Sequence, residues 1–284
     1  MSVSTSYAPL FTNLYDSNST SSGLLNALYG NSGQSLGAAN PLQALQTAEL
    51  NQTKDIAVTA KEPQVARDLA AFKSAVAAAK DPAALLNNPT VMKVLLTANG
   101  MSDQIPFTAL SRKAMLSNAK STTSLVSKLS AADSRWKPMV QTYDFANKGL
   151  SVLKQPSVLS TIANAYAEVT WRQSLDATTP GLSSALDFRS RAATVKTADQ
   201  VLGDPVLRDV ITTALGIPMQ IAFQDLTAQE HAITSRLDFS QLKNAHFVDT
   251  LTQEYLLNKA NASTTQSNQP TLDQLSAKAS GLIV

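Results

Sequence analysis

The sequence contains no cysteine among its 284 residues and only two histidines, His231 and His246. Without cysteine there is no disulfide framework, no thiolate nucleophile and no cysteine-ligated zinc or iron–sulfur centre. A metal site needs three or four converging ligands, and the pair His246 and Asp249, one helical turn apart, is better explained as a helix surface contact. We therefore expect no metal and no cofactor.

Two sequence patterns that mark common enzymes are also missing. The chain has no Gly-x-x-x-x-Gly-Lys-Ser/Thr phosphate loop and no Gly-x-Ser-x-Gly nucleophile elbow. The glycines at 30, 33 and 37 lack the lysine that a phosphate loop needs. We expect a protein that is not an enzyme. A site built from paired carboxylates stays open as an alternative, because such pairs meet in space rather than in sequence.

Charge and long apolar runs are scarce as well. Charged residues make up 15% of the chain, the net charge is +2, and no run of lysine and arginine indicates nucleic-acid binding. No apolar run approaches the roughly 18 residues of a membrane span. The first basic residue is Lys54, so the basic start of a secretory signal peptide is missing. These features predict a protein that is cytoplasmic or exported by a route independent of a signal peptide.

The first 40 residues differ in composition from the rest. Of these, 17 are Ser, Thr or Asn, and Asp16 carries the only charge. Such a segment buries too little apolar surface to offset the entropy of ordering, so we predict a disordered N-terminus over 1–40. Two helical modules are predicted at 41–150 and 151–260. A linker at 260–270 and a short amphipathic tail then complete the final segment, 261–284.

The ordered part is predicted to be all-α. Polar residues precede proline at several points, as in Asn40-Pro41 and Asp204-Pro205, and this pairing is typical of helix starts. Sustained alternation of polar and β-branched residues is lacking, so strands are not expected. Helices are predicted at 41–60, 63–80, 89–99, 107–117, 123–130, 134–145, 157–176, 180–195, 205–215, 224–237 and 240–259.

An internal repeat is the strongest signal in the chain. A shift of 116 residues places 69–101 on 185–217 without a gap, with 10 identities in 33 positions. Matched positions include helix starts, helix ends and apolar residues, which a chance likeness between alanine-rich helices does not explain. The pairs are predicted to be core anchors (Phe72 and Phe188), helix starts (Pro89 and Pro205) and helix-ending glycines (Gly100 and Gly216). Ile105 and Phe107 extend the match to Ile221 and Phe223. We therefore predict one helical unit used twice, packed into one bundle-like domain.

Several of these residues resemble a known family. The runs 67–73, 85–89, 94–100, 133–136 and 143–145 are similar to the pattern of the bacterial DUF1217 proteins. That pattern has an Asp-x-x-x-Phe helix, a helix end at glycine and an Asp-Arg-aromatic helix. The chain departs from it at Asn99, where the family has an aromatic residue. The resemblance implies an alphaproteobacterial setting among flagellar genes and implies no reaction.

Three residues are candidates for contact with a partner. Trp171 and Arg172 lie in a predicted helix, and Trp136 follows Asp133 and Arg135. Tryptophan and arginine are common at protein–protein hot spots. The alternative is that they form the packed junction between the two modules, with Glu168 as the near partner of Arg172. Two functions stay open: a structural or interaction protein of the flagellum, with protein partners, or a cytoplasmic helical binding module of the adaptor or chaperone type.

Overall fold

The computed structural model describes residues 40–267, and every regular element in this range is a helix. The predicted all-α fold is confirmed. The predicted disordered segment 1–40, apart from Asn40, and the tail after residue 267 lie outside the described residues. None of the described helices is long and apolar enough to span a membrane.

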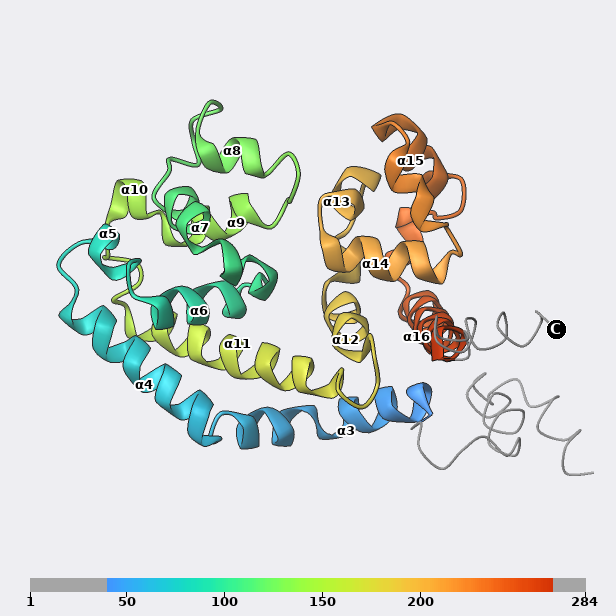
Figure 1. Cartoon of the computed structure of the whole chain (residues 1–284), viewed down its shortest axis with the longest axis horizontal. Helices are drawn as coiled ribbons and strands as arrows, with labels where there is room; N and C mark the ends of the chain where they lie inside the picture. Colours follow the sequence, from blue (N-terminus) through green and yellow to red (C-terminus); the bar gives the residue numbers. More distant parts are fainter. Residues whose placement is uncertain (1–39, 268–284) are drawn as a thin grey trace, which may run out of the picture.

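Two lobes lie side by side, and two long helices connect them (Figure 1). Helix α11 (Pro156–Leu175) runs beneath the first lobe and ends against the second. Helix α3 (Pro41–Thr59) contacts α11 and also α12 and α16 of the second lobe. Each lobe is therefore held to the other by a continuous helix as well as by direct contacts.

The first lobe precedes α11 in the chain, and the second follows it. The first lobe consists of α4 (Pro63–Ala78), α5 (Pro82–Leu85), α6 (Pro89–Ala98), η1 (Ser102–Phe107), α7 (Thr108–Met115), α8 (Leu125–Leu129), α9 (Trp136–Tyr143) and α10 (Phe145–Lys148). The second consists of α12 (Leu182–Arg191), η2 (Ala192–Thr194), α13 (Ala198–Leu202), α14 (Pro205–Ala214), η3 (Met219–Phe223), α15 (Leu226–Thr234), η4 (Phe239–Lys243) and α16 (Ala245–Ser267).

Each lobe has its own hydrophobic core, but the cores do not follow the predicted ranges 41–150 and 151–260. Ile162 and Tyr166, from the first half of α11, lie in the first core, whereas Trp171 at its far end lies in the second. Leu45 and Ala48 of α3 also belong to the second core. The N-terminal helix therefore packs on the lobe that is distant from it in the sequence.

Polar side chains start helices where the sequence predicts them. The side-chain oxygens of Asn40, Asp81, Asn88 and Asp204 accept hydrogen bonds from backbone N–H groups in the first turns of α3, α5, α6 and α14. Each of these helices has proline in its first turn, where a missing N–H costs nothing. Phe72 and Phe188 are fully buried, one in each core, as predicted.

The ends of α6 and α14 also agree with the sequence. Gly100 has φ +68° and Gly216 has φ +61°, the left-handed conformation that closes a helix. Next to each glycine, the N–H of the following residue bonds back into the helix: Met101 N to Leu96 O at 2.8 Å, and Ile217 N to Thr212 O at 2.8 Å.

Three predicted boundaries are wrong. The stretch 260–270 is not a linker throughout, because α16 continues to Ser267; no glycine or proline interrupts it before Pro270, and adding residues to an existing helix is easy. Thr179-Pro180 does not start a helix: Gly181 at φ +88° delays α12 to Leu182. The predicted helix 240–259 is divided into η4 and α16 at Asn244, whose side chain caps α16.

Candidate functional site

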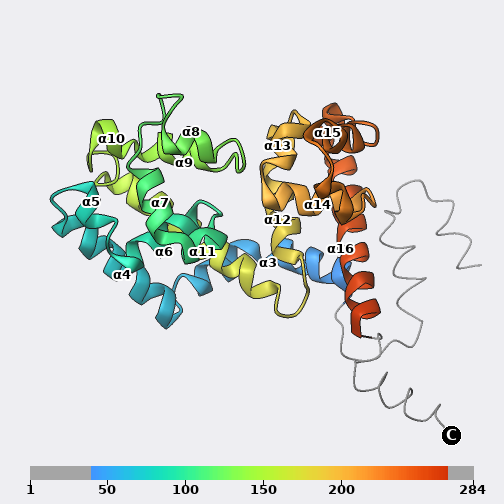
Figure 2. The same ribbon diagram turned by 45° about the horizontal axis from the view of Figure 1, so that its top comes forward.

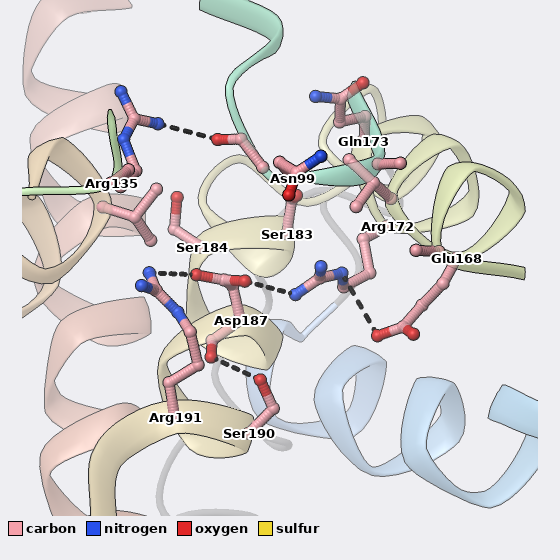
Figure 3. A pocket seen from close by; sticks show the side chains of 15 residues that line it. Asn99, Arg135, Glu168, Arg172, Gln173, Ser183, Ser184, Asp187, Ser190 and Arg191 are labelled. Atoms are coloured by element: carbon pink, nitrogen blue, oxygen red, sulfur yellow. Dashed lines mark hydrogen bonds and ion pairs between the residues drawn. The ribbon is translucent and has the colours of Figure 1, made fainter. Parts of the chain in front are cut away.

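A cavity of about 350 Å³ lies where the two lobes meet. The C-terminal end of α6, the second half of α11 and one face of α12 line it, so both lobes and the helix between them contribute (Figure 3). Most of its polar lining is charged or hydroxylic: Asn99, Arg135, Glu168, Arg172, Gln173, Ser183, Ser184, Asp187, Ser190 and Arg191.

Arg172 crosses this cavity from α11 to the second lobe. Its side chain is largely buried, and its Nη1 donates to Asp187 Oδ1 on α12 at 2.7 Å. The partner expected from the sequence, Glu168, is farther away, with its Oε1 3.8 Å from Arg172 Nε. Asp187 is therefore the main partner, and sequence reasoning missed it because helical spacing reveals only neighbours on the same helix.

Asp187 is shared between two guanidinium groups. Arg191, one turn further along α12, also bonds Asp187, and its Nη1 donates to Asp204 Oδ2 at 2.7 Å. Figure 3 shows Arg172 and Arg191 on either side of Asp187. Burial alone would raise the pKa of Asp204, but the ion pair with Arg191 and the backbone N–H of Leu207 hold that pKa below its ordinary value.

Arg135 forms a second ion cluster beside the cavity. Its guanidinium pairs with Asp133 at 2.7 Å and Asp103 at 2.9 Å, and it donates to the backbone oxygen of Gly100 at 2.7 Å. Burial works against the charge, but these two carboxylates outweigh it and raise the pKa of Arg135. The cluster ties the end of α6 to the start of α9.

Direct polar contacts also join the lobes around the cavity. The Ser134 N–H donates to the Gly203 oxygen at 2.6 Å, and Gln173 Nε2 donates to Ser102 Oγ at 2.9 Å. Asn99, where the chain departs from the family pattern, donates from Nδ2 to the Tyr143 hydroxyl at 2.8 Å. This amide links α6 to α9 within the first lobe.

The cavity is built mainly from groups that neutralise one another. All three guanidinium groups are engaged by carboxylates, and the serine hydroxyls at 183, 184 and 190 have no histidine among the lining residues. Within residues 40–267, no three His, Cys, Asp or Glu side chains are close enough to hold a metal ion. His231 and His246 are exposed on α15 and α16, away from this lining.

The remaining candidates for partner contact are buried. Trp136 lies in the first core and Trp171 in the second, and only 2% and 3% of their surfaces are exposed. Neither side chain is available at the surface for contact with a partner. A protein partner would therefore have to bind at other residues, which are exposed.

Large apolar residues are exposed on α3, at Leu50 and Val58, and at two places that match each other in the sequence. Phe107 and Leu110, at the joint of η1 and α7, are 58% and 39% exposed and are called edge 1 below. Met219, Phe223 and Leu226, at the joint of η3 and α15, are 89%, 89% and 57% exposed and are called edge 2. The sequence analysis identified the Phe107–Phe223 match but not the match of Leu110 to Leu226, and exposure could not be read from either.

The fold and the junction define an all-α protein with two helical lobes held together by a shared helix and buried ion pairs. The model of the DUF1217 family, proteins of unknown function, matches residues 98–248, which is 151 of the 284 residues. The chain belongs to this bacterial family, and the matched range contains the cavity and both edges.

One solved structure shows a similar fold. It is the crystal structure of a protein from Agrobacterium tumefaciens determined by structural genomics. The two chains are 21% identical with a TM-score of 0.65, and the similarity covers 80% of this chain and 96% of the other. No curated protein matches the chain.

Proposed function

We propose that this protein is a non-catalytic structural or interaction protein that contacts protein partners through edges 1 and 2. One observation carries the proposal: the same two residue types, Phe and Leu, are exposed in both lobes at positions 116 residues apart. Phe107 corresponds to Phe223 and Leu110 to Leu226.

Several other residues shared by the two runs have an internal role. Phe72 and Phe188 fill the cores, Gly100 and Gly216 close helices, and Ile105 and Ile221 pack against the two cores. The exposed Phe and Leu neither fill a core nor close a helix. Exposed aromatic residues held on an ordered element are typical of protein-binding surfaces, where they supply much of the binding energy.

The junction supports the same function in a different way. A buried pair such as Arg172–Asp187 ties α11 to α12 and so sets the relative position of the two lobes. The carboxylates of Asp187 and Asp204 are paired with guanidinium groups, an arrangement suited to holding structure rather than to proton transfer. This argues against the carboxylate enzyme that the sequence leaves open.

We further propose that this role lies among flagellar components, the setting that the sequence resemblance implies. The charge-poor, Ser/Thr/Asn-rich segment before Asn40 has the composition of flagellar export substrates. A cytoplasmic adaptor would use the same edges, so the two roles are distinguished by whether the protein is exported. Secretion of the full chain into the medium by a motile host supports the flagellar role, and retention in the cells supports the adaptor.

The edges are tested by complementation of a deletion strain of the host. A chain with Phe107, Leu110, Phe223 and Leu226 all changed to Ala is expected to fold with an unchanged thermal midpoint and to fail to restore the deletion phenotype. The matched control changes Leu50 and Val58 of α3, which are equally exposed but lie outside the edges, and it should restore the phenotype. Full complementation by the edge variant would contradict the proposal.

A further inference from the structure

Edges 1 and 2 share an apolar pattern that is closer than the rest of the repeat. Residues 104–110 read Gln-Ile-Pro-Phe-Thr-Ala-Leu and residues 220–226 read Gln-Ile-Ala-Phe-Gln-Asp-Leu. In both runs the isoleucine is partly buried against its core, while Phe and Leu are exposed. The two surfaces therefore offer a similar apolar contact.

The runs that contain the two edges differ in the sign of their net charge. The run 102–118 contains Asp103, Arg112 and Lys113, a sum of +1, and the matching run 218–234 contains Asp225 and Glu230, a sum of −2 with histidine neutral. The carboxylate of Asp103 is held by Arg135. The charges on α7 itself, Arg112 and Lys113, sum to +2, against −2 in the run of edge 2.

Opposite charge around similar apolar residues makes the two edges complementary to each other. Contact between two copies of edge 1, or two copies of edge 2, would bring like charges together, which costs binding energy. Contact between edge 1 and edge 2 pairs Phe with Phe and basic with acidic groups. The charge pattern thus selects the mixed pairing.

The edges are on different lobes, so a single molecule cannot use one to cover the other without losing its fold. Figures 1 and 2 both show α7 in the first lobe and α15 in the second. A molecule that uses edge 1 keeps edge 2 available for the next molecule. Such head-to-tail contacts continue into open assemblies unless their rotation closes a ring.

We infer that edge 1 of one copy of this chain binds edge 2 of a second copy, so that the protein assembles head to tail. The inference rests on the proposed function and names the partner at the same edges. It also explains why both lobes keep an exposed Phe and Leu while their surrounding charges differ.

Mixing two half-defective chains tests this pairing directly. Variant A changes Phe107 and Leu110 to Ala, and variant B changes Phe223 and Leu226 to Ala; sedimentation measures the mass of each over a range of concentrations. The wild type should exceed the dimer mass as concentration rises. Each variant alone should remain monomeric, because loss of central apolar anchors weakens binding by roughly thirtyfold or more. An equimolar mixture should form a dimer and nothing larger, since only one complementary pair of edges remains.

Charge reversal provides the second arm. Lys113→Glu and Glu230→Lys should each weaken the assembly, and the two changes combined in one chain should restore it; Leu50→Ala serves as the control. A wild type that stays monomeric at all concentrations overturns the inference, as does variant A or variant B assembling alone. The variant with all four edge residues changed to Ala separates this inference from the proposed function. If the wild type is monomeric while that variant still fails to restore the deletion phenotype, only self-assembly is refuted. If the wild type assembles but that variant complements, only the proposed function fails.

Discussion

Phe72 on α4 and Phe188 on α12 lie at the centres of the two cores, and neither has any exposed surface. Truncation of either side chain to Ala removes apolar contacts and leaves a cavity, so we expect a loss of about 3–5 kcal/mol in the free energy of unfolding. Urea denaturation of both variants measures it. The exposed Phe107→Ala change is the control and should cost far less. A melting temperature within about two degrees of the wild type would mean that the surrounding core tolerates the loss.

Asp204 combines two roles at one buried position. Its Oδ1 accepts from the N–H groups of Val206 and Leu207 at 2.9 and 3.2 Å, and its Oδ2 pairs with Arg191 at 2.7 Å. Asn88 fills the matching position of the first lobe and caps α6 without a charge. Asparagine is therefore a natural test for the charge alone.

We expect Asp204→Asn to keep the cap and to lose about 1.5–3 kcal/mol from the bond to Arg191. Asp204→Ala should cost about 1 kcal/mol more, because it also removes the cap. Urea denaturation at neutral pH compares the two variants. Equal losses would show that the cap contributes nothing measurable.

The ion pair of Asp204 also predicts how the free energy of unfolding depends on pH. Its pKa is lower in the folded chain than the ordinary value of 3.8, so between these two pKa values the unfolded chain binds more protons and stability rises with pH. The contribution is fully present above about pH 4 and is lost as pH falls through the lowered pKa. The stability gap between wild type and Asp204→Asn should therefore stay constant above about pH 4 and shrink below it. A gap that closes near neutral pH would contradict this assignment.

At the scale of elements, α6 and α14 have matching bounds. A shift of 116 residues carries Pro89–Ala98 onto Pro205–Ala214, and Gly100 onto Gly216. Helices α5 and α13, and η1 and η3, also fall in one register within one residue. We propose on this basis that the two lobes arose by duplication of one unit.

The duplication predicts equal behaviour at the two glycines. A Cβ added at either position meets no atom within 4 Å, so the cost of alanine comes from the left-handed backbone alone, about 1–2 kcal/mol. Gly100→Ala and Gly216→Ala should therefore lower the free energy of unfolding by similar amounts. An experimental structure should also superpose 69–101 on 185–217. Different helix paths in these runs would refute the duplication.

Elements that depend on local chemistry were predictable from the sequence. Asn88-Pro89 and Asp204-Pro205 start their helices, and both glycines end them, because capping and proline act on neighbouring residues. The short helices α5 and α13 were not among the predicted helix ranges, although Asp81-Pro82 has the pattern of a helix start, since four or five residues give no periodic signal. The end of α16 was also missed because polar residues do not stop a helix that is already formed.

At the scale of the whole molecule, long-range pairings decide the site. Arg172 was a candidate, yet its partner Asp187 comes from the next helix, and Arg191 and Asp204 complete a chain of ion pairs that no spacing rule contains. The placement of α3 on the second core was likewise not predictable, because the apolar residues of a helix do not identify the lobe on which it packs. Both results follow from the path of α11, which brings the lobes together.

The N-terminal segment is the last test at this scale. Asn40 caps α3 through its Oδ1, 3.0 Å from the Leu42 N–H, and Leu45 and Ala48 anchor α3 in the second core. Deletion of residues 2–39 leaves this cap and these anchors in place, so the thermal midpoint and the helical circular-dichroism signal should be nearly unchanged. Deletion of residues 2–50 should lower the midpoint, because it removes both anchors. In a motile host, the deletion of 2–39 should also abolish appearance of the protein in the medium, since we predict that the segment carries the export address. Unchanged secretion of the shortened chain would refute that role, and a lowered midpoint would show that the segment contributes to folding.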